Sequence, residues 1–230
     1  MIKTLVRLAI TQSELFNAWP DETVSRLIEA SAAHVVEAGE CVHRAGDVAK
    51  YLSLVVSGSM TLTRDMKSGR VFTAGVQLPG DFHGLGPVMA QTPYIYTATC
   101  KEKTSLVRIP ADLLRDIIAV NGRLSLSLFG ALEKRYMQAL HLHASAAVNS
   151  TQARIAGLLE SIDERSVHVH ATTQVNLSQD ELATMLGTRR QVVNRVLRDM
   201  AQEGAIHVQY GRITIVDREK LRAMAPPQDE

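Results

Sequence analysis

Hydrophobic and polar positions change their pattern along the chain. From Asp21 to Ala32, apolar residues recur at helical spacing after Pro20, which predicts a helix. Between about Val35 and Ile109 the pattern becomes short β-rich runs separated by turn signals, which indicates an all-β sandwich or barrel. The predicted strands include Leu52–Val56, Met60–Thr63, Val71–Val76 and Leu106–Ile109, with turns at Gly39, Gly46-Asp47, Ser57-Gly58, Ser68-Gly69 and Pro79-Gly80-Asp81.

After Pro110 the helical period returns, and the segment from Gly122 to Ala147 contains no proline. Its apolar residues alternate at spacings of three and four, as in the seam of a two-helix coiled coil. A helix packed on the core of its own domain would give the same pattern, so both interpretations stay open. Asn149 and Ser150 favour the start of another helix. The seam positions are Phe129, Leu132, Tyr136, Ala139, His143 and Ala146.

The segment from Leu177 to Leu197 predicts a helix, a tight turn and a second helix. Ser178 and Glu181 form a capping box at the start of the first helix. Gly187 suits the left-handed conformation that ends a helix. Thr188 and Gln191 predict a second capping box, from which the second helix would begin.

The second helix has the composition of a DNA-recognition helix. Its apolar positions can pack inward, and no acidic residue interrupts the stretch from Thr188 to Arg198. A recognition helix needs side chains that reach base edges beside cations that hold phosphates. The alternative is a solvated helix face that is merely rich in arginine. The predicted surface residues are Arg189, Arg190, Asn194, Arg195 and Arg198.

Short strands are predicted on both sides of this motif. Val167–Val169 and Thr172–Val175 precede it. Ile206–Val208 and Arg212–Val216 follow it, and the intervening Gln209-Tyr210-Gly211 favours a hairpin turn. The hairpin would form the wing of a winged helix-turn-helix that extends from about Ser178 to Val216.

Composition limits the remaining classes of protein. A chain of 230 residues with 46% hydrophobic and 21% charged residues is that of a globular protein of two modest domains. No apolar run suits a signal peptide or a membrane span, and two cysteines suit a reducing cytoplasm, so a cytoplasmic protein is expected. The sequence has no Walker loop, nucleophile elbow, dinucleotide fingerprint or zinc-type spacing. We therefore expect neither an enzyme nor a metal site.

Taken together, the motifs resemble the CRP/FNR family of bacterial regulators over nearly the full chain. The resemblance implies an α+β fold with an N-terminal β-roll (a double-stranded β-helix like that of cyclic-nucleotide-binding domains). It places this effector domain at residues 1–121, a dimerisation helix and hinge at 122–149 and a winged helix-turn-helix domain at 150–230. The residues that carry it are Glu37–Glu40, Gly46-Asp47, Leu52–Met60, Pro79–Phe82, Arg154–Ala156 and Ser178–Leu197.

The resemblance also implies partners and contacts. A homodimer would bind double-stranded DNA, and RNA polymerase would be a further partner. Arg190, Gln191 and Arg195 stand where the family reads bases, although the family usually has glutamate at the position of Gln191. A glutamate only accepts hydrogen bonds, whereas glutamine also donates, so a changed base preference is expected. The full set of predicted DNA contacts is Ser178, Thr188, Arg189, Arg190, Gln191, Asn194 and Arg195.

The effector pocket departs further from the family. Where cyclic-nucleotide members have an acid, a phosphate-binding arginine and polar base contacts, this chain has other residues. Without a cation the cyclic phosphate would be buried unpaired, which is costly, so cyclic AMP is not expected to bind. Leu85, Met89, Tyr94, Tyr96 and Leu140 indicate an apolar pocket instead. The matching positions are Gly84-Leu85, Tyr96-Thr97 and Ala139-Leu140.

Several alternatives for the effector stay open. The pocket would admit haem, a fatty or aromatic molecule, or nothing, and His83 and His143 are the candidate haem ligands. Cys41 and Cys100 could form a thiol switch or be structural, but they are too few for an iron–sulfur cluster. The chain would then be a haem- or thiol-based gas or redox sensor. A more distant alternative is a β-roll protein whose helix-turn-helix contacts only proteins.

Overall fold

The computed structural model describes residues 2–165 and 173–226. The chain divides into two compact units. Unit 1 comprises Met1–Arg64 and Ala74–Gln138, and unit 2 comprises Asp65–Thr73 and Ala139–Glu230. Within the described ranges, no helix combines the length and the apolar composition that crossing a membrane would need.

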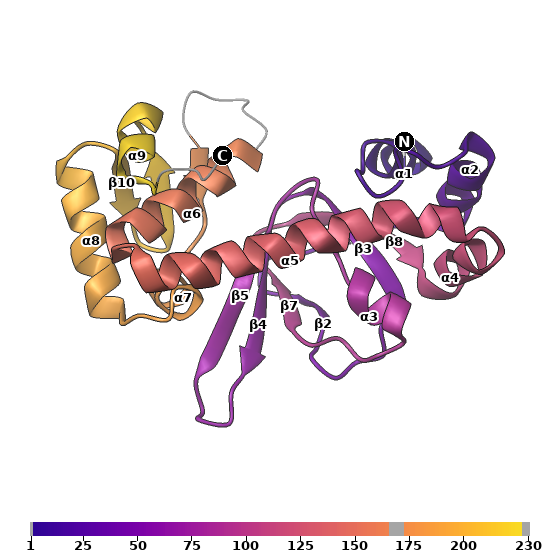
Figure 1. The fold of residues 1–230 in the computed structure, drawn as a ribbon, viewed down its shortest axis with the longest axis horizontal. Coiled ribbons are helices and arrows are strands. Elements are labelled where there is room, and N and C mark those ends of the chain that lie inside the picture. The colour runs from indigo at the N-terminus through magenta and orange to yellow at the C-terminus, as the bar shows by residue number, and fades with distance from the viewer. Residues whose placement is uncertain (1, 166–172, 227–230) are drawn as a thin grey trace. The chain divides into compact units, whose positions relative to one another are not determined.

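Two four-stranded sheets form a β-roll, which belongs to unit 1 except for the end of β4 and the start of β5 (Figure 1). The first has the order β1-β8-β3-β6 and the second the order β2-β7-β4-β5. The strands are β1 (Ala32–Val36), β2 (Cys41–His43), β3 (Tyr51–Ser57), β4 (Met60–Asp65), β5 (Val71–Gln77), β6 (Phe82–His83), β7 (Thr97–Cys100) and β8 (Thr104–Pro110). The predicted β-roll is confirmed.

Strand alternation divides the core of unit 1 into two clusters. One lies between the sheets and draws on both, with Val55 and Leu106 from the first sheet and Met60, Leu62, Ala98 and Cys100 from the second. The other joins Leu52, Leu54, Val107 and Ile109 to the surrounding helices. Successive side chains of a strand point to opposite faces. Ser53 and Arg108, which are paired in register, therefore point between the sheets.

Helices complete unit 1. They are α1 (Ile2–Thr11), α2 (Asp21–Ala30), α3 (Leu85–Ala90), α4 (Ala111–Val120), the short η1 (Gly122–Leu124) and the long α5 (Ser125–Val148), whose last part belongs to unit 2. The sequence predicted α2 and α5 but not α1, whose buried face includes Val6 and Ile10. The indole of Trp19 donates to Ser127 Oγ at 2.8 Å, and Ser127 Oγ donates to Leu15 O at 2.8 Å, which fixes the start of α5.

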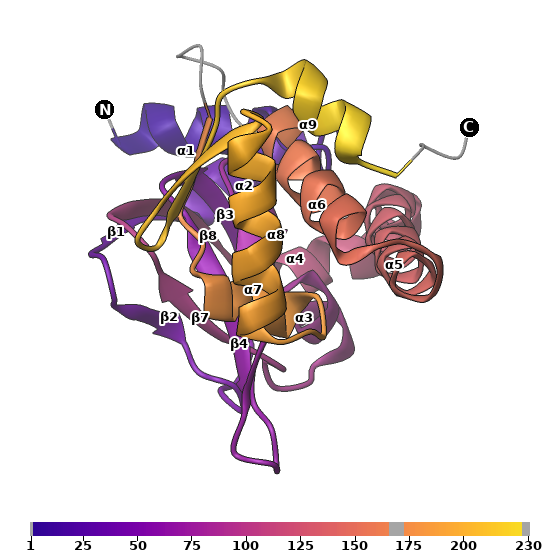
Figure 2. The same cartoon turned by 90° about the vertical axis from the view of Figure 1, so that its left-hand side faces the viewer.

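Unit 2 contains the helix-turn-helix and its wing (Figure 2). Its sheet has the order β10-β11-β9, and an ion pair between Arg218 and Asp163, with nitrogen and oxygen 2.7 Å apart, ties α9 to α6. The predicted strand at Val167–Val169 lies outside the described residues. The elements are α6 (Thr151–Arg165), β9 (Thr173–Val175), α7 (Gln179–Met185), α8 (Arg190–Gln202), β10 (Ile206–Gln209), β11 (Arg212–Ile215) and α9 (Arg218–Met224).

Candidate functional site: a basic helix and a sensor cavity

Helix α7 begins with the predicted capping box. Ser178 Oγ accepts from Glu181 N at 3.2 Å, and Glu181 Oε2 accepts from Ser178 N at 2.8 Å. The Ser178 hydroxyl also donates to Glu181 Oε2 at 2.8 Å, so it is engaged as donor and acceptor within the protein. Gly187 follows α7 with a φ of +61°, the left-handed conformation expected there. This half of the motif is confirmed.

The second predicted capping box is wrong. Helix α8 begins at Arg190, with Arg189 as the N-cap residue and no side-chain capping bond. Thr188 still belongs to the preceding turn, since its N–H donates to Ala183 O at 2.9 Å. Within the described residues no acceptor is bonded to the backbone N–H groups of Arg190 and Gln191. The start of α8 therefore presents free donors, which suit a phosphate oxygen.

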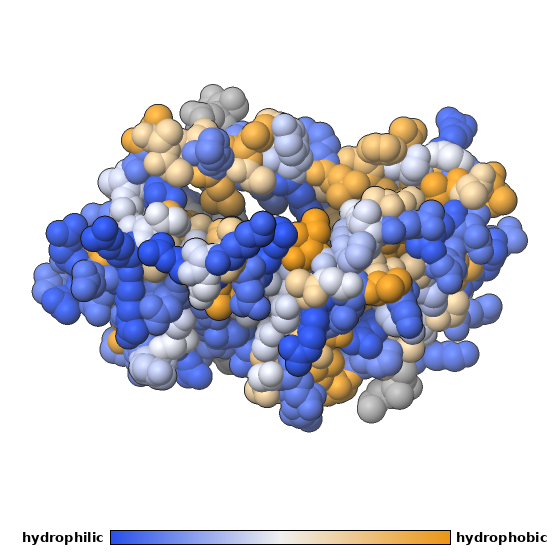
Figure 3. Space-filling model, turned by 90° about the horizontal axis from the view of Figure 1, so that it is seen from below, coloured by the Kyte–Doolittle hydropathy of each residue, from blue (hydrophilic) through white to orange (hydrophobic). Residues whose placement is uncertain are grey.

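The faces of α8 divide as predicted. Val193, Val196, Leu197 and Met200 are buried, whereas Arg189, Arg190, Gln191, Arg195 and Arg198 are exposed and Asn194 is half-buried. Hydrophilic side chains cover the left end of Figure 3, where α8 lies in Figure 1. The surface of α8 therefore combines positive charge with side chains that can donate and accept hydrogen bonds.

Two contacts hold side chains on this surface. Arg190 forms an ion pair with Asp180 of α7, with nitrogen and oxygen 3.0 Å apart. Sequence reasoning missed this acid because it lies ten residues earlier in the chain, on the neighbouring helix. Arg198 donates to Asn194 Oδ1 at 3.3 Å, which leaves the Asn194 amide to donate elsewhere.

The wing is a hairpin of β10 and β11. Gln209 pairs with Arg212, so the loop is Tyr210-Gly211, and Gly211 has a φ of +69°. Tyr210 is fully exposed at the tip. The predicted hairpin is confirmed.

Packing on the core of its own domain is confirmed for the first part of α5, and the coiled-coil seam stays a prediction. Leu128 and Ala131 are buried in the core of unit 1, and Leu132 packs against that core. Phe129 and Tyr136 instead remain 67% and 63% exposed in the single chain. Two large aromatic side chains one helical repeat apart on an exposed face suit a second copy of the helix.

The predicted effector residues lie in different surroundings. Gly84, with a φ of +94°, precedes α3, and a Cβ there would approach Tyr51 O and the Tyr94 ring to 3.0 Å. Leu85 is buried, and Thr97 Oγ1 accepts from Ala45 N at 3.1 Å. Tyr96 packs against the core between the sheets. The other two, Ala139 and Leu140, are exposed on the part of α5 that belongs to unit 2.

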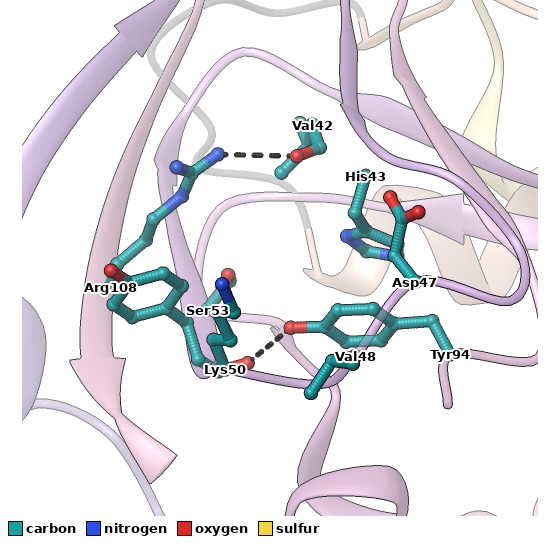
Figure 4. A pocket seen from close by; sticks show the side chains of 9 residues that line it. Val42, His43, Asp47, Val48, Lys50, Ser53, Tyr94 and Arg108 are labelled. Carbon is teal, nitrogen blue, oxygen red and sulfur yellow. Dashed lines mark hydrogen bonds between the residues drawn. The ribbon is translucent and has the colours of Figure 1, made fainter. Parts of the chain in front are cut away.

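Unit 1 holds a cavity of about 320 Å³ that none of these six residues lines (Figure 4). Tyr94 crosses its floor and donates its hydroxyl to Tyr51 O at 2.6 Å. Arg108 enters from β8 and donates to Val42 O at 3.4 Å. The lining residues are Val42, His43, Asp47, Val48, Lys50, Tyr51, Ser53, Tyr94 and Arg108.

Two histidines lie beside this cavity. His43 Nε2 and His83 Nε2 are 3.1 Å apart, and the His43 ring stacks on Tyr94 with centroids 3.7 Å apart. Burial lowers the pKa of His83 to about 3, with His43 and Arg135 as further causes. Burial also lowers the pKa of His43 to about 4, partly offset by Asp47. Both rings are neutral at pH 7, so one donates to the other.

The candidate redox residues lie on the paired strands β2 and β7, whereas the candidate haem ligands lie in different units. Cys41 is exposed and Cys100 is buried, and both are free thiols. Burial raises the pKa of Cys100, which disfavours the reactive thiolate. Of the two candidate haem ligands, His83 is paired with His43 in unit 1, and His143 is exposed on α5 in unit 2.

Comparison with known proteins gives matches to both parts of the chain. The cyclic nucleotide-binding domain family matches residues 33–121, and the Crp-like helix-turn-helix domain family matches residues 153–224. The chain is 26% identical over 190 residues to the CRP-like cAMP-activated global transcriptional regulator of Mycobacterium tuberculosis, covering 81% of this chain and 85% of that protein.

Two further proteins are similar over most of their length. The HTH-type transcriptional regulator Cmr of Mycobacterium tuberculosis is 25% identical over 209 residues, covering 89% of this chain and 80% of that protein. The structure of FixK2 from Bradyrhizobium japonicum has a TM-score of 0.75 at 18% identity, covering 86% of this chain and 99% of that one. Because both domains match in this order, the chain belongs to the CRP/FNR family of transcription regulators.

Proposed function

We propose that this regulator binds a specific, two-fold symmetric DNA site as a homodimer and responds to a small molecule other than cyclic AMP. The observation that carries the DNA-binding proposal is the exposed surface of α8, which has three arginines, a fourth arginine at the N-cap position and no side-chain cap. Arginine makes bidentate contacts with guanine, and glutamine or asparagine with adenine. Free N–H groups at a helix start favour phosphate oxygens.

Salt dependence tests DNA binding against the alternative that the helix-turn-helix contacts only proteins. Genomic fragments selected with the purified protein would supply the site, and binding would be measured from low to physiological salt. Each phosphate contact should add about one unit to the slope of log affinity against log salt. A flat slope with weak, sequence-independent binding would favour protein contacts.

The base-reading role of Gln191 has a sharp test. The structure gives α8 no side-chain cap, so a substitution at Gln191 leaves no capping bond to lose. Selection from randomised DNA with wild type and Gln191→Glu should recover different bases at one position per half-site, because glutamate can only accept. Identical recovered sites would exclude Gln191 as a specificity residue.

The dimer proposal rests on the exposed aromatic residues of α5. Replacing Phe129 and Tyr136 together by Glu should give a monomer at micromolar protein and weaken operator binding at least about 100-fold, because half-sites one DNA turn apart need both copies. Val120→Glu, which adds a charge at another exposed apolar residue of unit 1, is the matched control. A double variant that sediments as a dimer would remove the proposed interface.

The proposal against cyclic AMP follows from Leu85 and Tyr96 at the positions where cyclic-nucleotide members have an acid and a cation. Millimolar cyclic AMP or cyclic GMP should leave the melting temperature unchanged, because a ligand that does not bind cannot shift it. A saturable shift with either nucleotide would contradict the proposal.

Haem or thiol sensing is the second candidate function, and RNA polymerase is the protein partner that the family membership favours. Haem ligation through Nε2 of His83 would require this atom to leave His43 Nε2, which lies 3.1 Å away. An absorption spectrum and a mass spectrum of the native protein test for bound haem, and titration of the two thiols with and without oxidant tests for a thiol switch.

Co-sedimentation with RNA polymerase on operator DNA tests whether the polymerase is a partner.

A further inference from the structure

The cavity of unit 1 opens into the β-roll beside a positively charged side chain. Arg108 and Ser53 pair in register and point between the sheets, and Val42 faces them from β2 of the second sheet. Figure 4 shows the Arg108 guanidinium on one side of this space, with the Tyr94 ring and His43 on the other. A molecule in the cavity would therefore contact a cation and aromatic rings together.

Arg108 has no acidic partner among the residues that the structure describes. Among these residues the guanidinium has one hydrogen bond, to Val42 O, which is long at 3.4 Å, and the side chain is half-buried. The nearby carboxylate of Asp47 instead accepts from Arg44 N at 2.8 Å, within its own turn. A partly buried guanidinium gains most from a charge-assisted bidentate pair, so this one suits an external anion.

Charge and size restrict the anion. The cavity is lined by two cations, Arg108 and Lys50, and one acid, Asp47, which balance a single negative charge and oppose the second charge of a phosphate. A volume of about 320 Å³ is at the lower end for ligand pockets and excludes a dinucleotide. Val42, Val48 and the rings of Tyr51 and Tyr94 supply apolar walls.

We propose that this cavity binds a small organic monocarboxylate with an apolar body, held by its carboxylate on Arg108. The Ser53 hydroxyl lies on the strand beside Arg108 and can donate to the same carboxylate. That such a molecule acts as the effector rests on the proposed function; that it binds does not.

Binding is tested on the full-length protein without DNA, by nuclear magnetic resonance titration with benzoate and 3-methylbutanoate. Each acid has a neutral amide of the same shape, benzamide or 3-methylbutanamide, and inorganic phosphate is a further probe. Both carboxylates should give saturable shifts confined to resonances from Val42 to Ser53, Tyr94 and Arg108. The amides and phosphate should bind at least about 10-fold more weakly.

Two substitutions at Arg108 test whether its guanidinium contacts the carboxylate of the ligand. Arg108→Gln should weaken carboxylate binding about 10-fold or more, and Arg108→Lys, which keeps the charge but loses the planar fork, should weaken it less. Arg26→Gln removes one exposed positive charge from α2 of the same unit and should leave binding unchanged. The fluorescence of Trp19, the single tryptophan, checks that each variant is folded.

The proposal is overturned if neither carboxylate saturates, if the amides or phosphate bind as tightly, or if folded Arg108→Gln binds as wild type does. A separate measurement addresses regulation. If the carboxylates bind but leave operator affinity unchanged, the cavity is a ligand site and the proposed effector response through it fails.

Discussion

Helix α8 keeps its charged side chains in solvent, whereas the cavity of unit 1 is lined by a half-buried arginine and by His43, which burial keeps neutral together with its neighbour His83. On α8 the positive charges cost little, because water solvates them until DNA replaces it. Around the cavity, the buried polar groups such as Ser53 and His83 have to find a partner within the protein or in a ligand. Under the two proposals above, charge would serve a different purpose in each region: affinity for DNA on α8, and selection of a small anion in the cavity.

The largest expected effect concerns the exposed arginines at the start of α8 and along it. Arg190→Ala or Arg195→Ala should each cost about 1–3 kcal/mol at the specific site and relax preference at one base position per half-site. Arg189→Ala should instead weaken binding to all sequences and lower the salt slope by about one unit. Fluorescence anisotropy with specific and scrambled DNA at several salt concentrations separates the two. Equal losses on both DNAs for Arg190→Ala would contradict the base-reading role.

The next largest effect concerns His83, the buried histidine beside the cavity. Because the folded pKa of His83 is about 3, the unfolded chain takes up a proton near pH 6.5 while the native protein does not. The free energy of unfolding is therefore highest above pH 6.5 and falls as pH drops toward the folded pKa. Between pH 7 and pH 5 this histidine should remove about 2 kcal/mol.

Urea unfolding followed by Trp19 fluorescence measures this dependence in unit 1. His83→Leu should be less stable than wild type at pH 7, because His43 loses its partner, but its stability should fall less between pH 7 and pH 5. His207→Leu, at an exposed position on β10, is the control and should keep the wild-type dependence. An unchanged slope in His83→Leu would show that His83 is not kept neutral.

The smallest expected effect concerns the ion pair between Asp180 of α7 and Arg190 of α8. Asp180 holds Arg190 in an ion pair in which both side chains are exposed, by 64% and 59%, so the pair itself contributes less than about 1 kcal/mol. Asp180→Asn should leave stability nearly unchanged and raise DNA affinity a few-fold, because an acid beside the phosphates is removed. A loss of affinity would mean that Asp180 positions Arg190 for its base. Equilibrium binding with wild type in parallel decides.

The helix-turn-helix could be predicted because the residues that begin and end its first helix act locally in the sequence. Ser178, Glu181 and Gly187 act within one turn of their own position, and each behaves as predicted. Thr188 failed for a related reason: it fits a capping box by spacing, but its N–H is already used by the turn that ends α7. Which of two adjacent polar residues caps a helix depends on backbone geometry that spacing does not encode.

The cavity could not be predicted because it is assembled from distant segments. Arg108 is separated by more than fifty residues from Tyr51 and Ser53, and only the register of β3 and β8 brings them together. The approach of His43 to His83 likewise depends on how two sheets face each other. Helix α1 was not predicted, because its apolar residues were compared only with those of a signal peptide. The domain boundaries at 121 and 149 stay predictions.

The uncapped start of α8 has a consequence for how the free and bound protein move. Helix α7 supplies its own cap through Ser178 and Glu181, so its first turn is closed in any environment. The first turn of α8 lacks such a bond, and terminal turns of this kind fray. A phosphate oxygen would accept hydrogen bonds from the free N–H groups of this turn, so that bound DNA would stabilise the first turn of α8. Hydrogen exchange at the amides of Arg190 and Gln191 should then slow on the operator, while exchange in the first turn of α7 stays the same.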